Sequence, residues 1–274
     1  MQREHPPECA GNLARGFGVE FDHPFGDGVD GVIMPPRAKQ PFGVIIDTGM
    51  ANKKIIRWLP ALVGAFLTFG GNARSAGSGE FPDPAIDIKA GSGKQSVVLA
   101  GGCFWCTEAV FEIVEGVEDV LSGYSGGTKE TAKYDIVSTG RTGHAEAILI
   151  NYDPSKISYG QLLKIFFSVA HDPTSLNRQG ADTGPQYRSA IFYADDEQKR
   201  VAETYIKQIN DAHVLRKPIV TQVVPLDKFY TAEAYHQNYA VRNRSNPYIV
   251  NVSDPKVEKL KKMFPGCVRK KKER

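Results

Sequence analysis

The sequence predicts an α+β domain that follows an N-terminal extension of different composition. The chain has 274 residues, of which 41% are hydrophobic and 24% are charged, as in ordinary globular proteins. From residue 96 onwards, short apolar runs typical of strands are mixed with amphipathic segments that have helical spacing. These two kinds of segment do not alternate strictly. That favours an α+β arrangement over a doubly wound parallel sheet.

The N-terminal part has the composition of an extension rather than of a folded domain. Residues 1–49 are rich in Gly and Pro and lack a sustained period, so we expect a disordered or an untranslated extension. Met50 is followed by basic residues, an apolar run from Trp58 to Phe69, and small or polar residues to Ala76. This pattern predicts a signal peptide over 50–76, because the apolar run is short for a membrane-spanning helix.

Two localisations follow from this pattern. If Met50 starts translation, we expect a periplasmic or secreted protein. The alternative is a cytoplasmic protein in which the apolar run forms a buried or amphipathic helix. Residues 77–95, with their repeated Gly and Ser, are interpreted as a linker.

The first half of the domain is predicted as strand, helix, strand, helix. Residues 96–100 form a short apolar strand, which two glycines end, and residues 104–114 then have helical spacing. Residues 144–152 place alternate side chains on two sides, as a strand does. Residues 159–170 place two Leu and two Phe side chains on one face of a helix.

The second half is predicted to contain a strand over 189–193, an amphipathic helix over 195–212, a strand over 219–224 and a helix over 231–241. The catalytic domain is therefore expected over 96–266, followed by a basic tail over 267–274. The formal net charge is only +3, so we expect no nucleic-acid partner.

The cysteines point to chemistry rather than to a disulfide scaffold. Four cysteines are too few for such a scaffold, and two of them form the pair Cys103 and Cys106. Cys103 follows two glycines at the start of a predicted helix, where free N–H groups and a partial positive charge stabilise a thiolate. Cys106 lies one turn later, where a disulfide with Cys103 is feasible. We therefore expect an enzyme with Cys103 as its nucleophile.

Two other interpretations of this pair are weighed here. A zinc site needs four ligands, and the sequence has neither a second C-x-x-C nor a close His pair, so no metal or other cofactor is expected. A thioredoxin-like disulfide reductase also places C-x-x-C at a helix start after a strand. Against it, Phe104 and Trp105 are bulky and apolar, and they suit a small apolar group better than many protein disulfides.

Six short motifs follow one another along the chain. They are Gly102-Cys103-Phe104-Trp105, Ser122 to Gly127, Gly143-His144-Ala145-Glu146-Ala147, His171-Asp172-Pro173, Gly184-Pro185-Gln186-Tyr187-Arg188-Ser189 and Tyr235 to Tyr239. Together they resemble peptide methionine sulfoxide reductase of the A type, the peptide-methionine (S)-S-oxide reductases. The resemblance runs from about Val97 to Phe264. It implies a two-layer ferredoxin-like sandwich of mixed sheet and helices. It also implies reduction of the S epimer of methionine sulfoxide, free or in oxidised proteins, as protein repair under oxidative stress.

The resemblance also implies roles for particular residues. Cys103 attacks the sulfoxide sulfur and becomes a sulfenic acid. The sulfoxide oxygen needs a proton as it leaves, and Glu146 matches the acid that supplies it, a role that burial would support by raising its pKa. Residues matching those that hold the substrate are Phe104 and Trp105 for its methyl group, and Tyr134, Asp182 and Tyr187 for its oxygen or for support of the site.

This sequence departs from many family members at Cys106, where they have Gly and use a distant resolving cysteine. We predict that Cys106 closes a disulfide with Cys103, and that thioredoxin or a similar donor reduces it. Cys267, in what looks like a loose tail, is either a second relay or a bystander, and Cys9 is expected outside the mature protein. His144 and His236 are interpreted as structural, and the protein is expected to be a monomer.

Overall fold

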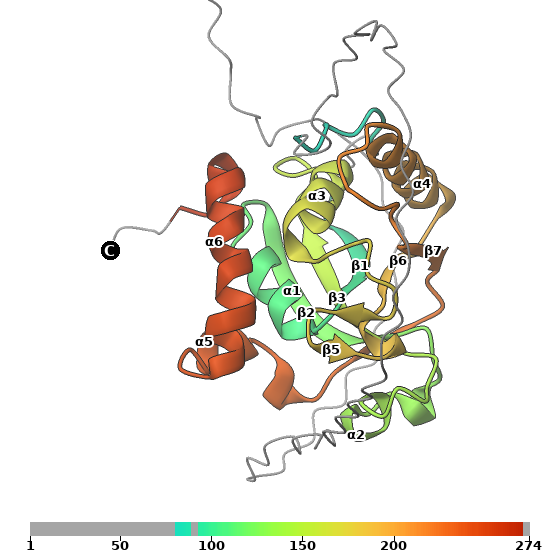
Figure 1. Cartoon of the computed structure of the whole chain (residues 1–274), viewed down its shortest axis with the longest axis vertical. Coiled ribbons are helices and arrows are strands. Elements are labelled where there is room, and N and C mark those ends of the chain that lie inside the picture. The colour runs from blue at the N-terminus through green and yellow to red at the C-terminus, as the bar shows by residue number, and fades with distance from the viewer. Residues whose placement is uncertain (1–79, 89–92, 271–274) are drawn as a thin grey trace, which may run out of the picture. The chain divides into compact units, whose positions relative to one another are not determined.

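The computed structural model describes residues 80–88 and 93–270 (Figure 1). The extension over 1–49, the signal peptide over 50–76 and Cys9 lie outside these ranges, as do the last four residues of the basic tail. Within the described ranges, no helix has the length and apolar character needed to cross a membrane.

Six strands of the described chain form one mixed sheet (Figure 1). Their order is β7-β6-β1-β3-β2-β8, and all neighbours are antiparallel except β6 and β7. The strands are β1 (Gln95–Gly101), β2 (Val117–Ser125), β3 (Ala145–Tyr152), β6 (Ser189–Tyr193), β7 (Gln222–Pro225) and β8 (Phe229–Thr231).

The central part of this sheet has the βαββαβ order of a ferredoxin-like fold. Helix α1 (Phe104–Phe111) connects β1 to β2, and α3 (Tyr159–Ile165) lies between β3 and β6. Strands β7 and β8 extend the sheet at its two edges. The prediction of an α+β, ferredoxin-like fold is confirmed.

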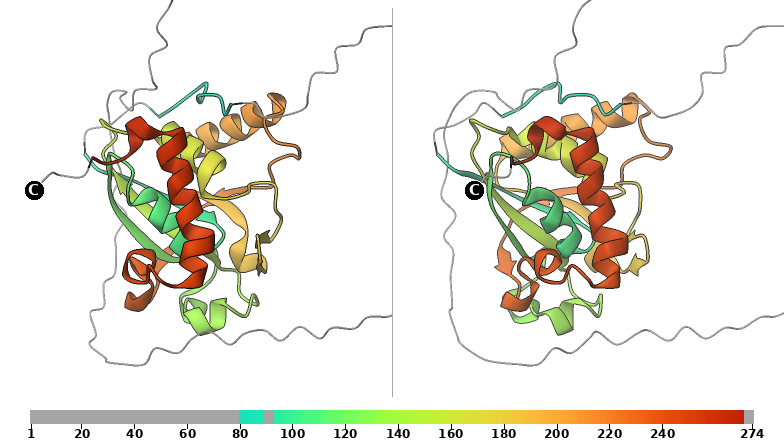
Figure 2. Two further views of the ribbon diagram at one scale, coloured as in Figure 1. Left: turned by 60° about the vertical axis from the view of Figure 1, so that its left-hand side comes forward. Right: turned by 90° about the vertical axis from the view of Figure 1, so that its left-hand side faces the viewer.

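The remaining helices complete the layer beside the sheet. Figure 2 shows α6 lying across α1, and α4 runs along the edge near β6 and β7. Their bounds are α2 (Tyr134–Val137), α4 (Asp196–Asp211), α5 (Tyr239–Arg242) and α6 (Asp254–Met263). Single turns occupy Lys129–Thr131, Phe166–Ala170, Pro185–Tyr187, Ala234–His236, Ile249–Ser253 and Pro265–Cys267.

The two faces of the sheet carry different side chains because residues alternate along each strand. In β3, Ile148 and Ile150 belong to the large core beneath the helices, whereas Ala145 and Ala147 belong to a smaller cluster on the opposite face. Glu146 has the parity of Ile148, so the strand directs its carboxyl toward the helix layer.

The predicted elements largely match the observed ones. The three strands over 96–100, 144–152 and 189–193 are confirmed to within one residue, and the helix over 195–212 is confirmed as α4. The helix over 159–170 divides into α3 and a π-helical turn, and the one over 104–114 ends at Phe111.

The single helix predicted over 231–241 is wrong. Here the chain forms the end of β8, a short turn and then α5, because Asn238 adopts a left-handed conformation with φ 53°. The Gln237 side chain also bonds the backbone of Ser122 and Ala232, which holds the chain away from a continuous helix.

Residues 80–88 form a strap, which packs on the domain although it falls within the range expected as a linker. Phe81, Ile86 and Ile88 contact the large core. The Asp87 carboxylate accepts hydrogen bonds from the Gly160 N–H at 2.8 Å and from the Ser158 hydroxyl at 2.5 Å. Farther along the strap, Asp83 pairs with Lys164 and the carbonyl of Pro82 accepts from Tyr205.

Candidate active site

Cys103 lies at the junction between β1 and α1, where it is the N-cap residue of the helix. The preceding Gly102 has φ +87°, a conformation that side chains disfavour. A Cβ at Gly102 would also lie 2.4 Å from Cγ of Gln179. Glycine is therefore required here both by the backbone and by the close approach of Gln179.

The two thiols of the C-x-x-C pair are both buried and act on each other. Burial raises the pKa of Cys103 well above its ordinary value, and the hydrogen bond with Cys106 raises it further. The same hydrogen bond lowers the pKa of Cys106 to about 7, against the effect of its own burial. The proton therefore stays on Cys103 and negative charge favours Cys106. From the sequence, we expected the helix N-terminus to favour a thiolate at Cys103. The effect of burial on the pKa of Cys103 is larger and has the opposite sign.

Glu146 faces the same junction from β3. Its Oε2 accepts a hydrogen bond from the Phe104 N–H at 3.0 Å, so the carboxyl is held beside the first turn of α1. The side chain is only 2% exposed, and burial raises its pKa to about 8. The carboxyl is consequently protonated in most molecules at neutral pH.

Two tyrosines have phenols near enough to this carboxyl for its charge to affect their pKa values. Tyr134 begins α2, and Tyr187 lies in the turn Pro185–Tyr187, which precedes β6. Burial raises the pKa of both phenols, and the nearby charges of Glu146 and Cys103 raise them further. Both hydroxyls therefore stay protonated and can donate hydrogen bonds to an oxygen bound between them and Cys103.

Asp182 is brought to the site by a two-stranded hairpin of β4 (Arg178–Gln179) and β5 (Asp182–Thr183). Its Oδ2 accepts a hydrogen bond from the Tyr248 hydroxyl at 2.5 Å. That hydroxyl lies 3.8 Å from Sγ of Cys106, and it contributes to the low pKa of this thiol. Sequence reasoning missed Tyr248, which belongs to none of the motifs and lies 66 residues from Asp182.

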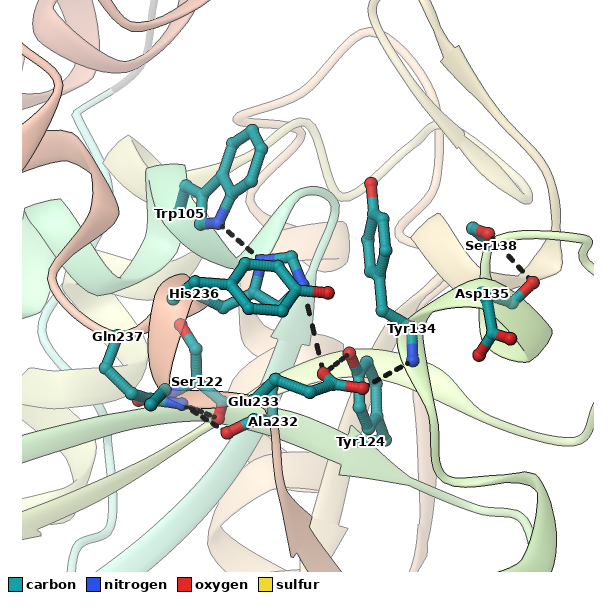
Figure 3. Close-up of polar contacts among 12 residues, drawn as sticks. Trp105, Ser122, Tyr124, Tyr134, Asp135, Ser138, Ala232, Glu233, His236 and Gln237 are labelled. Atoms are coloured by element: carbon teal, nitrogen blue, oxygen red, sulfur yellow. Dashed lines mark hydrogen bonds and ion pairs between the residues drawn. The ribbon is translucent and has the colours of Figure 1, made fainter. Parts of the chain in front are cut away.

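Trp105 is fixed by the segment that follows β8, as Figure 3 shows. Its Nε1–H donates to Nδ1 of His236 at 3.1 Å, and the Tyr239 ring stacks on the indole with centroids 3.7 Å apart. Burial lowers the pKa of His236 to about 4, so the ring is neutral. Because Nδ1 accepts, the ring proton lies on Nε2, which faces Glu233 at 3.9 Å.

Glu233 connects this arrangement to the tyrosines (Figure 3). Its carboxylate accepts from the Tyr124 hydroxyl and from the Tyr134 N–H, both at 2.9 Å. His236 therefore has the structural role expected from sequence, but that role serves Trp105 directly. His144 bonds the Thr128 carbonyl, and its ring lies edge-on to the ring of Tyr124 with centroids 6.1 Å apart.

All the residues that the sequence predicted for the site gather around Cys103. They are Phe104, Trp105, Cys106, Tyr134, Glu146, Asp182 and Tyr187. In the described part of the chain, no group of three or more His, Cys, Asp or Glu side chains is arranged to hold a metal ion.

Cys267 lies away from this cluster, at the other end of α1. It is 5% exposed, and its carbonyl accepts a hydrogen bond from the Glu115 N–H at 2.7 Å. Val268 then forms a bridge with Val114. The expectation of a loose tail is therefore wrong for Cys267 and Val268, since backbone hydrogen bonds attach them to the segment between α1 and β2.

The amino-acid sequence is similar to a family model and to known proteins. A family model described as peptide methionine sulfoxide reductase matches residues 95–266. The chain is 50% identical over 186 residues to "Peptide methionine sulfoxide reductase MsrA 2" of Mesorhizobium japonicum, which covers 68% of this chain and 95% of the relative. It is also 50% identical over 210 residues to the protein of the same name from Synechocystis, with 75% and 95% covered.

Solved structures of two proteins are also similar to this chain in fold and sequence. Reduced Mxr1 from Saccharomyces cerevisiae is 30% identical with a TM-score of 0.51, covering 59% of this chain and 92% of that one. Methionine sulfoxide reductase A of Corynebacterium diphtheriae is 33% identical with a TM-score of 0.50, covering 60% and 84%.

Proposed function

Because the chain belongs to the peptide methionine sulfoxide reductase family, we propose that it reduces methionine sulfoxide to methionine at Cys103. The sulfur of Cys103 attacks the sulfoxide sulfur, and the sulfoxide oxygen passes to Cys103 as methionine leaves. Cys103 is thereby oxidised to a sulfenic acid while the substrate is reduced by two electrons. The observation that carries this proposal is the buried Glu146 carboxyl beside the nucleophile, with its Oε2 3.0 Å from the Phe104 nitrogen and its pKa raised by burial to about 8.

Glu146 is the proposed proton donor for the sulfoxide oxygen. A carboxyl with a pKa of about 8 holds a proton at neutral pH and can transfer it to the sulfoxide oxygen as negative charge develops on that oxygen. The neutral phenols of Tyr134 and Tyr187 donate hydrogen bonds to the same oxygen. As the sulfur of Cys103 attacks, its thiol proton passes to Glu146, while the proton that Glu146 gave stays on the oxygen of the sulfenic acid, so the buried site gains no net charge.

Phe104 and Trp105 are the proposed pocket for the methyl group on the substrate sulfur. Phe104 is buried, and Trp105 is held in place by His236 and Tyr239. An apolar surface next to the nucleophile orients the sulfoxide so that its oxygen points toward Glu146. The preference for the S epimer is proposed because the family resemblance implies it.

Cys106 is the proposed resolving cysteine. It lies one turn from Cys103, and the two thiols are hydrogen-bonded. The Cys106 sulfur attacks the sulfenic acid, a disulfide forms and water leaves. We propose that thioredoxin or a thioredoxin-like protein then reduces this disulfide. Since Cys267 lies at the far end of α1, we propose that it is a bystander in this cycle.

The test uses resolved epimers of methionine sulfoxide with dithiothreitol as reductant. We expect the wild type to consume the S epimer only and Cys103→Ser to show no turnover. When thioredoxin replaces dithiothreitol, Cys106→Ser should release one methionine per enzyme and then stop. The main alternative, a thioredoxin-like disulfide reductase, predicts reduction of protein disulfides with both epimers untouched. Full thioredoxin-driven cycling by Cys106→Ser would show that another cysteine resolves the sulfenic acid.

We further propose that translation starts at Met50 and that the protein is exported, which is supported by the basic, apolar and small-residue order of 50–76. The N-terminal sequence of the native protein tests this. A protein that begins at Met1 and keeps its apolar run would be cytoplasmic. An exported monomer would need a reductant suited to an oxidising compartment.

A further inference from the structure

A shallow groove lies between two loops that are far apart in sequence. One loop leads into β4, and the other connects α4 to β7 (Figure 1). The Val220 N–H donates to the Pro173 carbonyl at 2.9 Å, which ties the two loops together. We call this feature the basic groove, and the side chains that matter in it are Asp172, Leu176, Arg178, Leu215, Arg216 and Lys217.

The basic groove carries positive charge that the protein does not neutralise. Arg178, Arg216 and Lys217 are all exposed, and within residues 80–88 and 93–270 none of them forms an ion pair. The lining has one carboxylate, that of Asp172. Its oxygens accept hydrogen bonds from Thr174 and Ser175 in their own loop. Three cations thus face one carboxylate that is already bonded, which suits an acidic ligand.

The groove also has an apolar side. Leu176 is 66% exposed, and Leu215 lines the wall near it. A single exposed Leu is common on proteins and indicates nothing by itself. Next to three cations, however, it favours a ligand that combines carboxylates with apolar groups, as a peptide does, over a small inorganic anion.

Gln179 connects the groove to the nucleophile. Its amide makes two hydrogen bonds with the backbone of Asp172, at 3.0 and 2.8 Å, and so closes the loop that forms one wall. The same side chain packs against Gly102, the residue before Cys103. Neighbours of a methionine sulfoxide bound at Cys103 would reach the groove within a few residues, since an extended chain advances about 3.3 Å per residue.

From this juxtaposition we propose that the basic groove binds acidic residues that flank the oxidised methionine in protein substrates. The proposal rests on the proposed function and names the substrate class that this site prefers. Complementary charge would raise kcat/KM for acidic peptides, mainly through capture of the substrate.

The test compares two double variants with dithiothreitol as reductant, so that no protein reductant takes part. Arg216→Glu with Lys217→Glu reverses the charge at two positions of the basic groove. Arg200→Glu with Lys207→Glu makes the same change in net charge on α4, at residues outside the groove lining. Substrates are one peptide with the S sulfoxide between Asp residues, one with it between Lys residues, and the free amino acid.

For the groove variant, we expect kcat/KM with the Asp peptide to fall roughly tenfold, as two exposed attractions become repulsions. The Lys peptide should gain or hold its rate, free methionine sulfoxide should be unchanged, and the wild-type preference for the Asp peptide should fade as salt screens the charges. An equal fall in the control variant would overturn the proposal, since net charge alone would then be responsible.

Other outcomes separate this proposal from the one on which it rests. If the wild type reduces free methionine sulfoxide but shows no preference for the Asp peptide, the groove proposal is wrong and the function stands. If the groove variant loses rate only when thioredoxin replaces dithiothreitol, the groove serves the reductant and the proposal is again wrong. If free methionine sulfoxide is not reduced at all, the proposed function itself fails.

Discussion

Glu146→Gln should make the protein more stable at neutral pH while it removes most of the activity. The amide keeps an oxygen that can accept the Phe104 N–H, so the fold around the first turn of α1 should persist. What it removes is a titrating group. The carboxyl has a folded-state pKa of about 8 against an ordinary value of 4.5, and burial is the main cause.

The pH dependence follows from proton binding in the two states. Between pH 5 and 7.5 the unfolded carboxyl is ionised while the folded one keeps its proton, so the folded state binds more protons and the wild type loses stability as pH rises. A difference of one proton over about 2.5 pH units corresponds to about 3 kcal/mol. Gln does not titrate, so Glu146→Gln should gain about 3 kcal/mol relative to the wild type over this interval.

The assay is urea unfolding of both proteins at pH 5 and at pH 7.5, compared as a difference of differences so that all other groups cancel. In parallel, kcat/KM with dithiothreitol should fall roughly 10² to 10⁴-fold, the usual contribution of a general acid. A stability difference that does not change with pH would refute the reasoning, because Glu146 would then ionise at its ordinary pKa.

Three further predictions follow from single contacts. Gly102→Ala should lower the free energy of unfolding by about 2–4 kcal/mol in urea titrations, because φ is +87° and the new Cβ would meet the Gln179 side chain. The control Gly180→Ala, with φ +58° and open space around the position, should lower it by only about 1 kcal/mol. His236→Phe should raise KM for methionine sulfoxide about fivefold with little change in kcat, because Trp105 loses its acceptor, and unchanged steady-state constants would contradict this role. Asp87→Ala should lower the unfolding free energy by about 1–2 kcal/mol without altering kcat, since the start of α3 loses two hydrogen bonds, and an unaltered urea midpoint would show that the strap contributes nothing.

The elements with clear periodicity could be predicted from the sequence because their side chains face one core. The strand around Glu146 is an example, since its side chains alternate between two sides in the sequence as they do in the structure. The segment after β8 could not be predicted in the same way. Its apolar spacing suits a helix, but the bonds of Gln237 to Ser122 depend on a strand 115 residues away.

The same limit applies to the site. The family resemblance was sufficient to bring Cys103, Glu146, Tyr134 and Tyr187 together as candidate site residues. The link from Asp182 through Tyr248 to Cys106 depends on contacts between distant segments and has no local signal. The protonation of the two cysteines was also beyond the sequence, because it depends on how deeply the pair is buried and on which thiol donates.

The fixed position of Trp105 gives the enzyme an optical reporter. The chain has two tryptophans, and Trp58 lies in the segment that we expect export to remove. In the mature protein, all indole fluorescence would then come from Trp105, which stacks on Tyr239 and lies between Cys103 and Cys106 in the sequence. Binding of substrate, formation of the disulfide and its reduction would each change the surroundings of that one ring. The steps of the cycle could therefore be timed separately in rapid-mixing experiments without any attached dye.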